Sequence, residues 1–244
     1  MPHKYFCEEL TPDAQSALLT GDEARHMAVV LRAQPGDAVV LCDGRGSDYD
    51  AVVRTAAPGE VWLDIRACAP CASEPDVQVT LYVGYPKQEK LEHVIQKATE
   101  LGAVRVVPFF SRFCVAKPKN EEQKNARYRR IALEAAKQSG RGTVPDVALP
   151  VPFAAALAAA AQADAALFCW EAAAGCAPLR ERLAGGVRTV AILTGSEGGF
   201  SPEEARQALD AGCAPLSLGP RILRCETAPL AALAAVMTLT GNLE

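Results

Sequence analysis

The sequence predicts an α/β protein in which a small amino-terminal β-barrel precedes a larger domain of parallel strands covered by helices. Residues 1–70 contain short alternating runs with frequent turn signals, which is typical of a small all-β domain. From about residue 77 onwards, strands alternate with helices. A run of helix and strand breakers between Pro70 and Pro75 separates the two patterns. We therefore expect two domains, at residues 1–72 and 73–244.

The first domain is predicted from its hairpin and its strand spacing. The segments Ala38–Cys42 and Asp50–Arg54 flank the turn-forming tetrapeptide Asp43–Gly46. Val61–Arg66 alternates again, and several short strands at close spacing favour a barrel. One helix is predicted to interrupt the strands, from about Asp22 to Leu31.

The second domain is predicted from apolar strands separated by segments of helical period. The expected strands are Val77–Val83, Val104–Val107, Ala165–Cys169, Thr189–Leu193 and Pro215–Leu218. The expected helices include Gln88–Leu101, Glu121–Ser139 and one that starts at Ser201-Pro202-Glu203-Glu204, a capping box with proline at its first position. This order implies a parallel sheet with helices on both faces.

Composition indicates an ordinary globular protein, with 50% apolar and 22% charged residues. No uninterrupted apolar run reaches membrane-spanning length, and the first residues lack the apolar core of a signal peptide. We expect a cytoplasmic protein. Its nine cysteines include one C-x-x-C pair, Cys68 and Cys71, but no second pair completes a metal site, so free thiols are expected.

The charge of the chain is unevenly distributed. Residues 101–145 hold ten basic and three acidic side chains, a formal charge of +7, which leaves −11 for the remainder of a chain whose total is −4. A basic stretch on an acidic protein suits contact with nucleic-acid phosphates. A solvated helix face is the alternative, and composition alone does not choose between them.

A glycine-rich loop follows the predicted strand Thr189–Leu193. It reads Leu193-Thr194-Gly195-Ser196-Glu197-Gly198-Gly199-Phe200. Glycines let backbone amides approach a ligand closely, and loops at the carboxyl ends of parallel strands are the usual ligand sites. The spacing excludes the dinucleotide and P-loop signatures, and a tight strand-to-helix turn is the structural alternative.

A second loop concentrates charge between a predicted strand and a helix. It spans Ser217–Ala228 and contains Arg221, Arg224 and Glu226. Charges at such a junction are costly unless they are paired or used on a ligand. A structural Arg–Glu pair is the alternative to a binding site.

Together these motifs resemble the SPOUT superfamily, specifically its RsmE ribosomal RNA methyltransferases. The resemblance covers nearly the whole chain. It rests on the loops Leu193–Phe200 and Leu218–Ala228, on Arg25-His26, Val30–Arg32, Gly36-Asp37 and Asp43–Gly46, and on Gln96–Gly102, Pro108, Ser111-Arg112, Glu134–Arg141 and Val144-Pro145. Two positions depart from the family pattern: Ser196 stands where proline is usual, and Cys225 where threonine is usual.

The resemblance implies a carboxyl-terminal trefoil-knotted SPOUT methyltransferase domain, preceded by a PUA-like β-barrel that binds RNA. It implies S-adenosylmethionine (SAM) as the cofactor and no metal. The expected SAM contacts are Thr194, Gly195, Glu197, Gly198, Leu218, Gly219, Ile222 and Leu223. The segment Cys169–Glu171, which follows an earlier strand, is a candidate third wall of the same pocket.

The implied reaction is methylation of uridine N3 in small-subunit (16S) ribosomal RNA, within the assembled subunit. Because N3 carries a proton at neutral pH, cationic groups are needed to stabilise the uridine anion. Arg221 and Arg224 are the candidates, with Glu197 or Glu226 orienting them. The expected RNA contacts are Arg25, His26, Arg32, Arg112, Lys117, Lys119, Arg127, Arg130 and Arg141.

Other interpretations remain open. A SPOUT methyltransferase that acts on another RNA or on ribose is one, and a non-catalytic ribosome-assembly protein that binds RNA is another. A homodimer is expected because Thr227–Asn242 is almost wholly apolar, and a helix that is apolar all round must be buried on every side. Burial within its own domain is the alternative.

Overall fold

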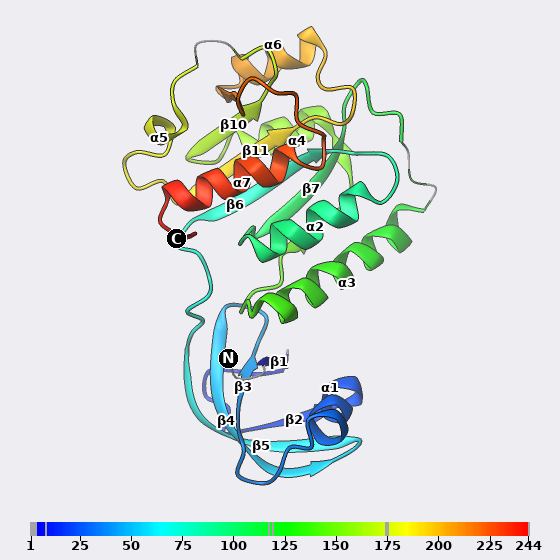
Figure 1. The fold of residues 1–244 in the computed structure, drawn as a ribbon, viewed down its shortest axis with the longest axis vertical. Helices are drawn as coiled ribbons and strands as arrows, with labels where there is room; N and C mark the ends of the chain where they lie inside the picture. The colour runs from blue at the N-terminus through cyan, green and yellow to red at the C-terminus, as the bar shows by residue number, and fades with distance from the viewer. Residues whose placement is uncertain (1–3, 8, 117, 119, 174–175, 244) are drawn as a thin grey trace. The chain divides into compact units, whose positions relative to one another are not determined.

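The computed structural model describes residues 4–7, 9–116, 118, 120–173 and 176–243. The chain forms two compact units (Figure 1). The first contains Met1–Glu74 and the returning segment Ala136–Val144, and the second contains Pro75–Ala135 and Pro145–Glu244.

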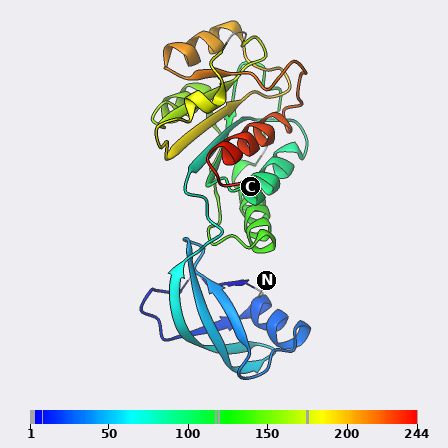
Figure 2. The same cartoon turned by 60° about the vertical axis from the view of Figure 1, so that its left-hand side comes forward.

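The first unit is a five-stranded sheet, and Figure 2 shows that this sheet is curled. Its spatial order is β1-β3-β4-β5-β2, with only the β1–β3 pair parallel. The strands are β1 (Lys4–Phe6), β2 (Ser16–Thr20), β3 (Ala38–Cys42), β4 (Ser47–Ala57) and β5 (Glu60–Pro70). Alternate side chains of these strands fill one apolar core, in which Tyr49, Val61 and Leu63 are fully buried.

The predicted hairpin and helix of this unit are confirmed. β3 and β4 pair antiparallel across the expected turn, where the Asp43 carboxylate accepts hydrogen bonds from the backbone amides of Arg45 and Ser47. The helical segment consists of α1 (Gly21–Arg25) and a π-helical turn, η1 (His26–Val30). Strands β1 and β2 were not predicted.

A buried ion pair holds the returning segment in the first unit. The Arg141 guanidinium lies 2.7 Å from the Glu74 carboxylate, and Glu74 also accepts from the backbone amides of Gly142 and Thr143. Burial alone would raise the pKa of Glu74, but Arg141 and the two amides hold that pKa below its ordinary value. The carboxylate therefore stays charged, as the buried arginine requires.

The second unit is built on a parallel sheet, which confirms the predicted α/β class. The order is β12-β10-β11-β6-β7-β8, with β9 also beside β7. The strands are β6 (Gln78–Gly84), β7 (Arg105–Phe110), β8 (Asp146–Val147), β9 (Val151–Pro152), β10 (Ala165–Cys169), β11 (Thr189–Thr194) and β12 (Ala214–Leu216).

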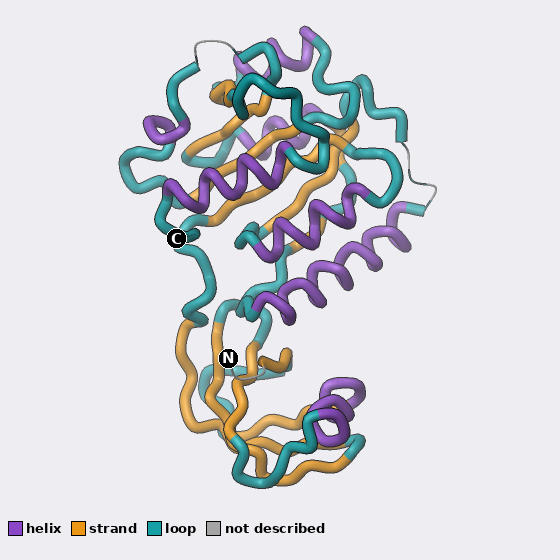
Figure 3. The backbone as a smooth tube through the Cα atoms, viewed as in Figure 1, coloured by secondary structure: helices purple, strands orange, loops and turns teal. Residues whose placement is uncertain are grey.

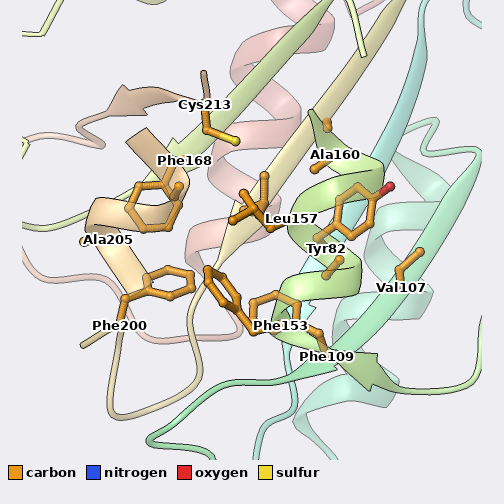
Figure 4. Packing of buried hydrophobic residues seen from close by; sticks show 14 residues of the cluster. Tyr82, Val107, Phe109, Phe153, Leu157, Ala160, Phe168, Phe200, Ala205 and Cys213 are labelled. Carbon is orange, nitrogen blue, oxygen red and sulfur yellow. The ribbon is translucent and has the colours of Figure 1, made fainter. Parts of the chain in front are cut away.

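Helices cover both faces of this sheet, as the tube drawing shows (Figure 3). α2 and α7 pack together, and α7 lies against β6 and β11. α4 and α6 contribute to the core on the opposite face, where Phe109, Phe153, Phe168 and Phe200 pack together (Figure 4). The helices are α2 (Lys90–Glu100), α3 (Glu121–Ser139), α4 (Phe153–Ala160), α5 (Leu179–Arg182), α6 (Pro202–Asp210) and α7 (Ala228–Leu239).

Two helix starts next to the predicted ligand loops differ in their capping. α6 begins with the expected capping box: the Ser201 side chain accepts from the Glu204 amide, and Glu204 accepts from the Ser201 amide. Thr227 precedes α7 as expected, but its side chain makes no capping hydrogen bond.

None of the described helices is both long and apolar enough to span a membrane. The trefoil knot stays a prediction.

Candidate functional site

The candidate site lies at the carboxyl ends of three neighbouring strands, β10, β11 and β12. Because parallel strands end at the same edge of a sheet, the loops that follow them meet there. These loops enclose a cavity of about 780 Å³, a size typical of a small-molecule site. All of its lining residues belong to the second unit.

The structure brings the predicted ligand residues together around this one cavity. Both predicted loops line it, and so does the candidate third segment, Cys169–Glu171. The lining includes every expected SAM contact: Thr194, Gly195, Glu197, Gly198, Leu218, Gly219, Ile222 and Leu223. The expected catalytic arginines, Arg221 and Arg224, line it as well.

The glycine-rich loop is compact because its glycines allow close backbone contacts. A Cβ atom on Gly195 would lie 3.0 Å from the Gly199 Cα, and one on Gly198 would lie 2.6 Å from the Phe113 Cβ. Gly199 has a φ of +64° and donates its amide to the Ser196 carbonyl at 3.0 Å. A side chain at Gly195 would thus crowd the loop backbone itself, a reason that the sequence did not reveal.

A further glycine, Gly84, sets the position of this loop. It ends β6, the strand next to β11, and a Cβ atom there would lie 2.4 Å from the backbone nitrogen of Ser196. Real Cβ atoms essentially never approach this closely, so the loop can pass over β6 only because residue 84 lacks a side chain. Gly84 was not predicted as a site residue, because its signal in the sequence is only that of a glycine at the end of an apolar strand.

A lysine outside the cavity binds acidic residues of both ligand loops. The Lys90 Nζ lies 3.1 Å from the Glu197 Oε1 and 3.5 Å from the Glu226 Oε2. Glu197 Oε1 also accepts from the backbone amide of Lys87 at 3.0 Å. Glu197 or Glu226 was expected to orient Arg221 and Arg224. Among the described residues no ion pair joins these groups, and Lys90, which pairs with both carboxylates, was not predicted.

The ionisation of this cluster follows from its contacts. The hydrogen bond that the Lys90 ammonium donates to Glu197 raises the pKa of Lys90. Burial opposes ionisation of Glu197 and Glu226, but hydrogen bonds and the Lys90 charge hold the pKa of both carboxyl groups below the ordinary value. Burial and the hydrogen bond to Glu226 raise the pKa of the Cys225 thiol to about 12, so it stays protonated and donates to Glu226.

The two arginines are left available at the cavity. Both are exposed, and within the described part of the chain neither forms an ion pair. The loop that carries them turns at Gly219, which has a φ of +96°. Two guanidinium groups without a carboxylate partner beside a cavity are suited to bind an anionic or electron-rich ligand group.

The predicted RNA contacts are distributed over both units. In the first unit, Arg25, His26 and Arg32 are exposed, whereas Arg141 is 2% exposed and bound to Glu74. In the second unit, the exposed residues are Arg112, Arg127 and Arg130. Lys117 and Lys119 lie outside the described residues.

Comparison with known proteins adds independent information. A family model described as an RNA methyltransferase domain matches residues 73–237, and one described as an RNA methyltransferase PUA domain matches residues 19–66. Two similar proteins are the ribosomal RNA small subunit methyltransferase E of Bacillus subtilis and that of Mycobacterium tuberculosis. The first is 31% identical, over 96% of this chain and 95% of its own; the second is 32% identical, over 98% and 92%.

Solved structures share the whole fold. A ribosomal RNA small subunit methyltransferase E from Neisseria gonorrhoeae, bound to S-adenosyl methionine, superimposes with a TM-score of 0.85 at 29% identity, over 98% of both chains. A probable rRNA-methyltransferase from Porphyromonas gingivalis gives a TM-score of 0.82 at 33% identity, over 99% of both chains.

The close approach at Gly84 generates a stability prediction. Gly84→Ala should lower the free energy of unfolding by about 1–3 kcal/mol, because the added methyl group must displace the Gly195–Ser196 backbone. Gly59→Ala is the matched control: a Cβ atom there would meet nothing within 4 Å, so its effect should stay within about 0.5 kcal/mol. Denaturant unfolding measures both. Equal effects would show that the contact at Gly84 contributes nothing.

Proposed function

The chain belongs to the ribosomal RNA small subunit methyltransferase E family, and we propose that it transfers a methyl group from SAM to uridine N3 in small-subunit ribosomal RNA. The cavity at the carboxyl ends of β10, β11 and β12 is the observation that carries this proposal. It gathers all eight expected SAM contacts beside two exposed arginines.

The residues around the cavity fit SAM. When bound, SAM supplies a methyl group already activated by its positive sulfonium. Glu171 lies at this cavity, and a carboxylate there favours a cationic ligand. Leu218 and Leu223 supply apolar surface, while the glycine-rich backbone of residues 195–199 leaves its polar groups close to the ligand space.

The arginines provide the electrostatic part of the proposed reaction. Uridine N3 becomes nucleophilic only after its proton leaves, and the negative charge then spreads over the base. Arg221 and Arg224 line the cavity without a carboxylate partner in the described residues, so their charge is available to stabilise that anion. Glu197 acts by holding the glycine-rich loop through Lys87 and Lys90.

Exposed basic residues are the proposed RNA contacts. In the second unit these are Arg112, Arg127 and Arg130, and in the first unit Arg25, His26 and Arg32.

Phosphate contacts contribute to RNA affinity in proportion to their number, and they weaken as the salt concentration rises. Replacing Arg112 and Arg130 with glutamate should therefore weaken RNA binding and flatten its salt dependence, and an unchanged slope would overturn this assignment.

The first of three predictions about the reaction and the assembly concerns the cofactor and the modified atom. The wild-type protein should bind SAM in calorimetry, and Gly195→Val should abolish that binding, because the added side chain would push the loop backbone away from Gly199. Nucleoside mapping of ribosomal RNA from a deletion strain should reveal loss of a 3-methyluridine. If the protein binds SAM but the deletion removes a methyl group from ribose or from transfer RNA, the protein is a methyltransferase with a different target. If it does not bind SAM, a purely RNA-binding role is favoured.

The second prediction concerns the proton on N3. If Arg221 and Arg224 stabilise the uridine anion, Arg221→Leu or Arg224→Leu should raise the pKa of the bound base. Single-turnover methylation by either variant should then fall near neutral pH and recover partly as pH rises, with SAM affinity little changed. A deficit of the same size at every pH would indicate that the arginine positions the base instead.

The third prediction concerns a homodimer that covers α7. The helix buries one face within its own unit: Pro229, Ala232, Leu233, Val236 and Met237. Other apolar residues of the helix, among them Leu230, Ala231, Ala234 and Ala235, are half-buried, and Leu239 is exposed. A second copy of this chain is the proposed cover. Light scattering should give twice the 25.8 kDa of one chain, and Leu230→Glu should shift the mass towards the monomer. A monomeric wild type at micromolar concentration would overturn the proposal.

A further inference from the structure

Lys90 is the charged group at which the two ligand loops meet. It is the first residue of α2, and it belongs to neither loop and does not line the cavity. Its ammonium nevertheless lies within ion-pair distance of one carboxylate from each loop, Glu197 after β11 and Glu226 after β12. It also approaches the Cys225 Sγ at 3.8 Å. One side chain therefore connects two segments that are 29 residues apart in the sequence.

We propose that Lys90 is a positioning residue that holds the glycine-rich loop and the arginine-bearing loop at a fixed separation, and thereby sets both SAM affinity and the rate of methyl transfer. The effect of Lys90 on the two loops is inferred from its contacts with Glu197 and Glu226. Its effect on SAM binding and RNA methylation rests on the proposed function. Lys90 acts through Glu197 and Glu226 and touches neither cofactor nor base.

The arrangement needs a cation at this point. Glu197 and Glu226 approach the same ammonium, so they lie near each other and would repel if it were absent. Both carboxyl groups have lowered pKa values and are charged at neutral pH, so the repulsion would be present under working conditions. An ammonium with three donors satisfies both carboxylates at once.

The two loops depend on Lys90 unequally. Glu197 keeps a second anchor, the backbone amide of Lys87, when the lysine is removed. Among the described residues, the remaining hydrogen bonds of the Glu226 side chain are local, to Cys225 and to its own backbone, and they fix nothing outside that loop. Loss of Lys90 should therefore free the arginine-bearing loop more than the glycine-rich loop, and the effect should reach Arg221 and Arg224.

The test compares three variants of the full chain. Lys90→Met removes the charge and keeps much of the side-chain volume, and Lys90→Arg keeps the charge. Lys97→Met is the matched control, because Lys97 lies on the same helix and is paired only with Glu100, 2.7 Å away, among the described residues. Amide hydrogen exchange without ligand, SAM calorimetry and single-turnover methylation at saturating SAM are measured for each.

Lys90→Met should speed amide exchange in residues 195–199 and more strongly in residues 221–226. It should also weaken SAM binding and slow the saturated rate, each by about three- to tenfold, the range expected for the loss of two partly exposed ion pairs. Lys90→Arg should restore most of each loss, and Lys97→Met should change none of the three readouts.

The outcomes separate the positioning role from the function. Unchanged exchange in both loops of Lys90→Met would overturn the positioning role, whatever the enzyme does. A Lys90→Met variant with weaker SAM binding but an unchanged saturated rate would overturn the link to the arginine-bearing loop. A wild type that binds no SAM and methylates no RNA would instead overturn the proposed function together with the catalytic half of this proposal, while the exchange data still decide the structural half.

Discussion

The site depends on a backbone contact at the carboxyl end of β6. β6 and β11 are parallel neighbours, and the chain leaving β11 passes directly over Gly84, with no room for a side chain between them. This contact fixes where the glycine-rich loop begins. The loop then folds on itself through Gly195 and Gly199 and reaches Phe113 through Gly198. The cavity is therefore shaped by the packing of backbone segments, which side-chain motion alters little.

The ion pairs of the site leave Arg221 and Arg224 without a carboxylate partner among the described residues. One carboxylate from each ligand loop, Glu197 and Glu226, pairs with Lys90, which does not line the cavity. If Glu197 and Glu226 had paired with Arg221 and Arg224, the guanidinium groups would have been committed before a substrate arrived. A preorganised cation that needs no rearrangement stabilises developing charge most effectively. The lysine is thus the residue that allows the two arginines to serve a ligand.

The sequence was informative wherever the signal was local. The strand Ala165–Cys169, the helix Glu121–Ser139 and the capping box at Ser201 were predicted at their observed positions, since periodicity and capping lie within short segments. The two ligand loops were also identified, because glycines and charges after strands are local patterns. Lys90 and Gly84 were missed: their partners are more than 100 residues away, and only the order of the strands brings them together.

The formal charge of the basic stretch overestimates the charge that is available to bind RNA. Of the ten basic residues between 101 and 145, four form ion pairs with carboxylates of the same chain: Arg141 with Glu74, Lys137 with Glu23, Arg127 with Glu92 and Arg105 with Asp146. A paired side chain releases fewer counterions when it meets a phosphate, so it contributes less to affinity. The exposed residues of this stretch that form no ion pair with the described residues are Arg112, Lys124, Arg129 and Arg130. All four belong to the second unit, the unit that contains the cavity. The charge available to RNA in this stretch is therefore concentrated on the same unit as the proposed chemistry.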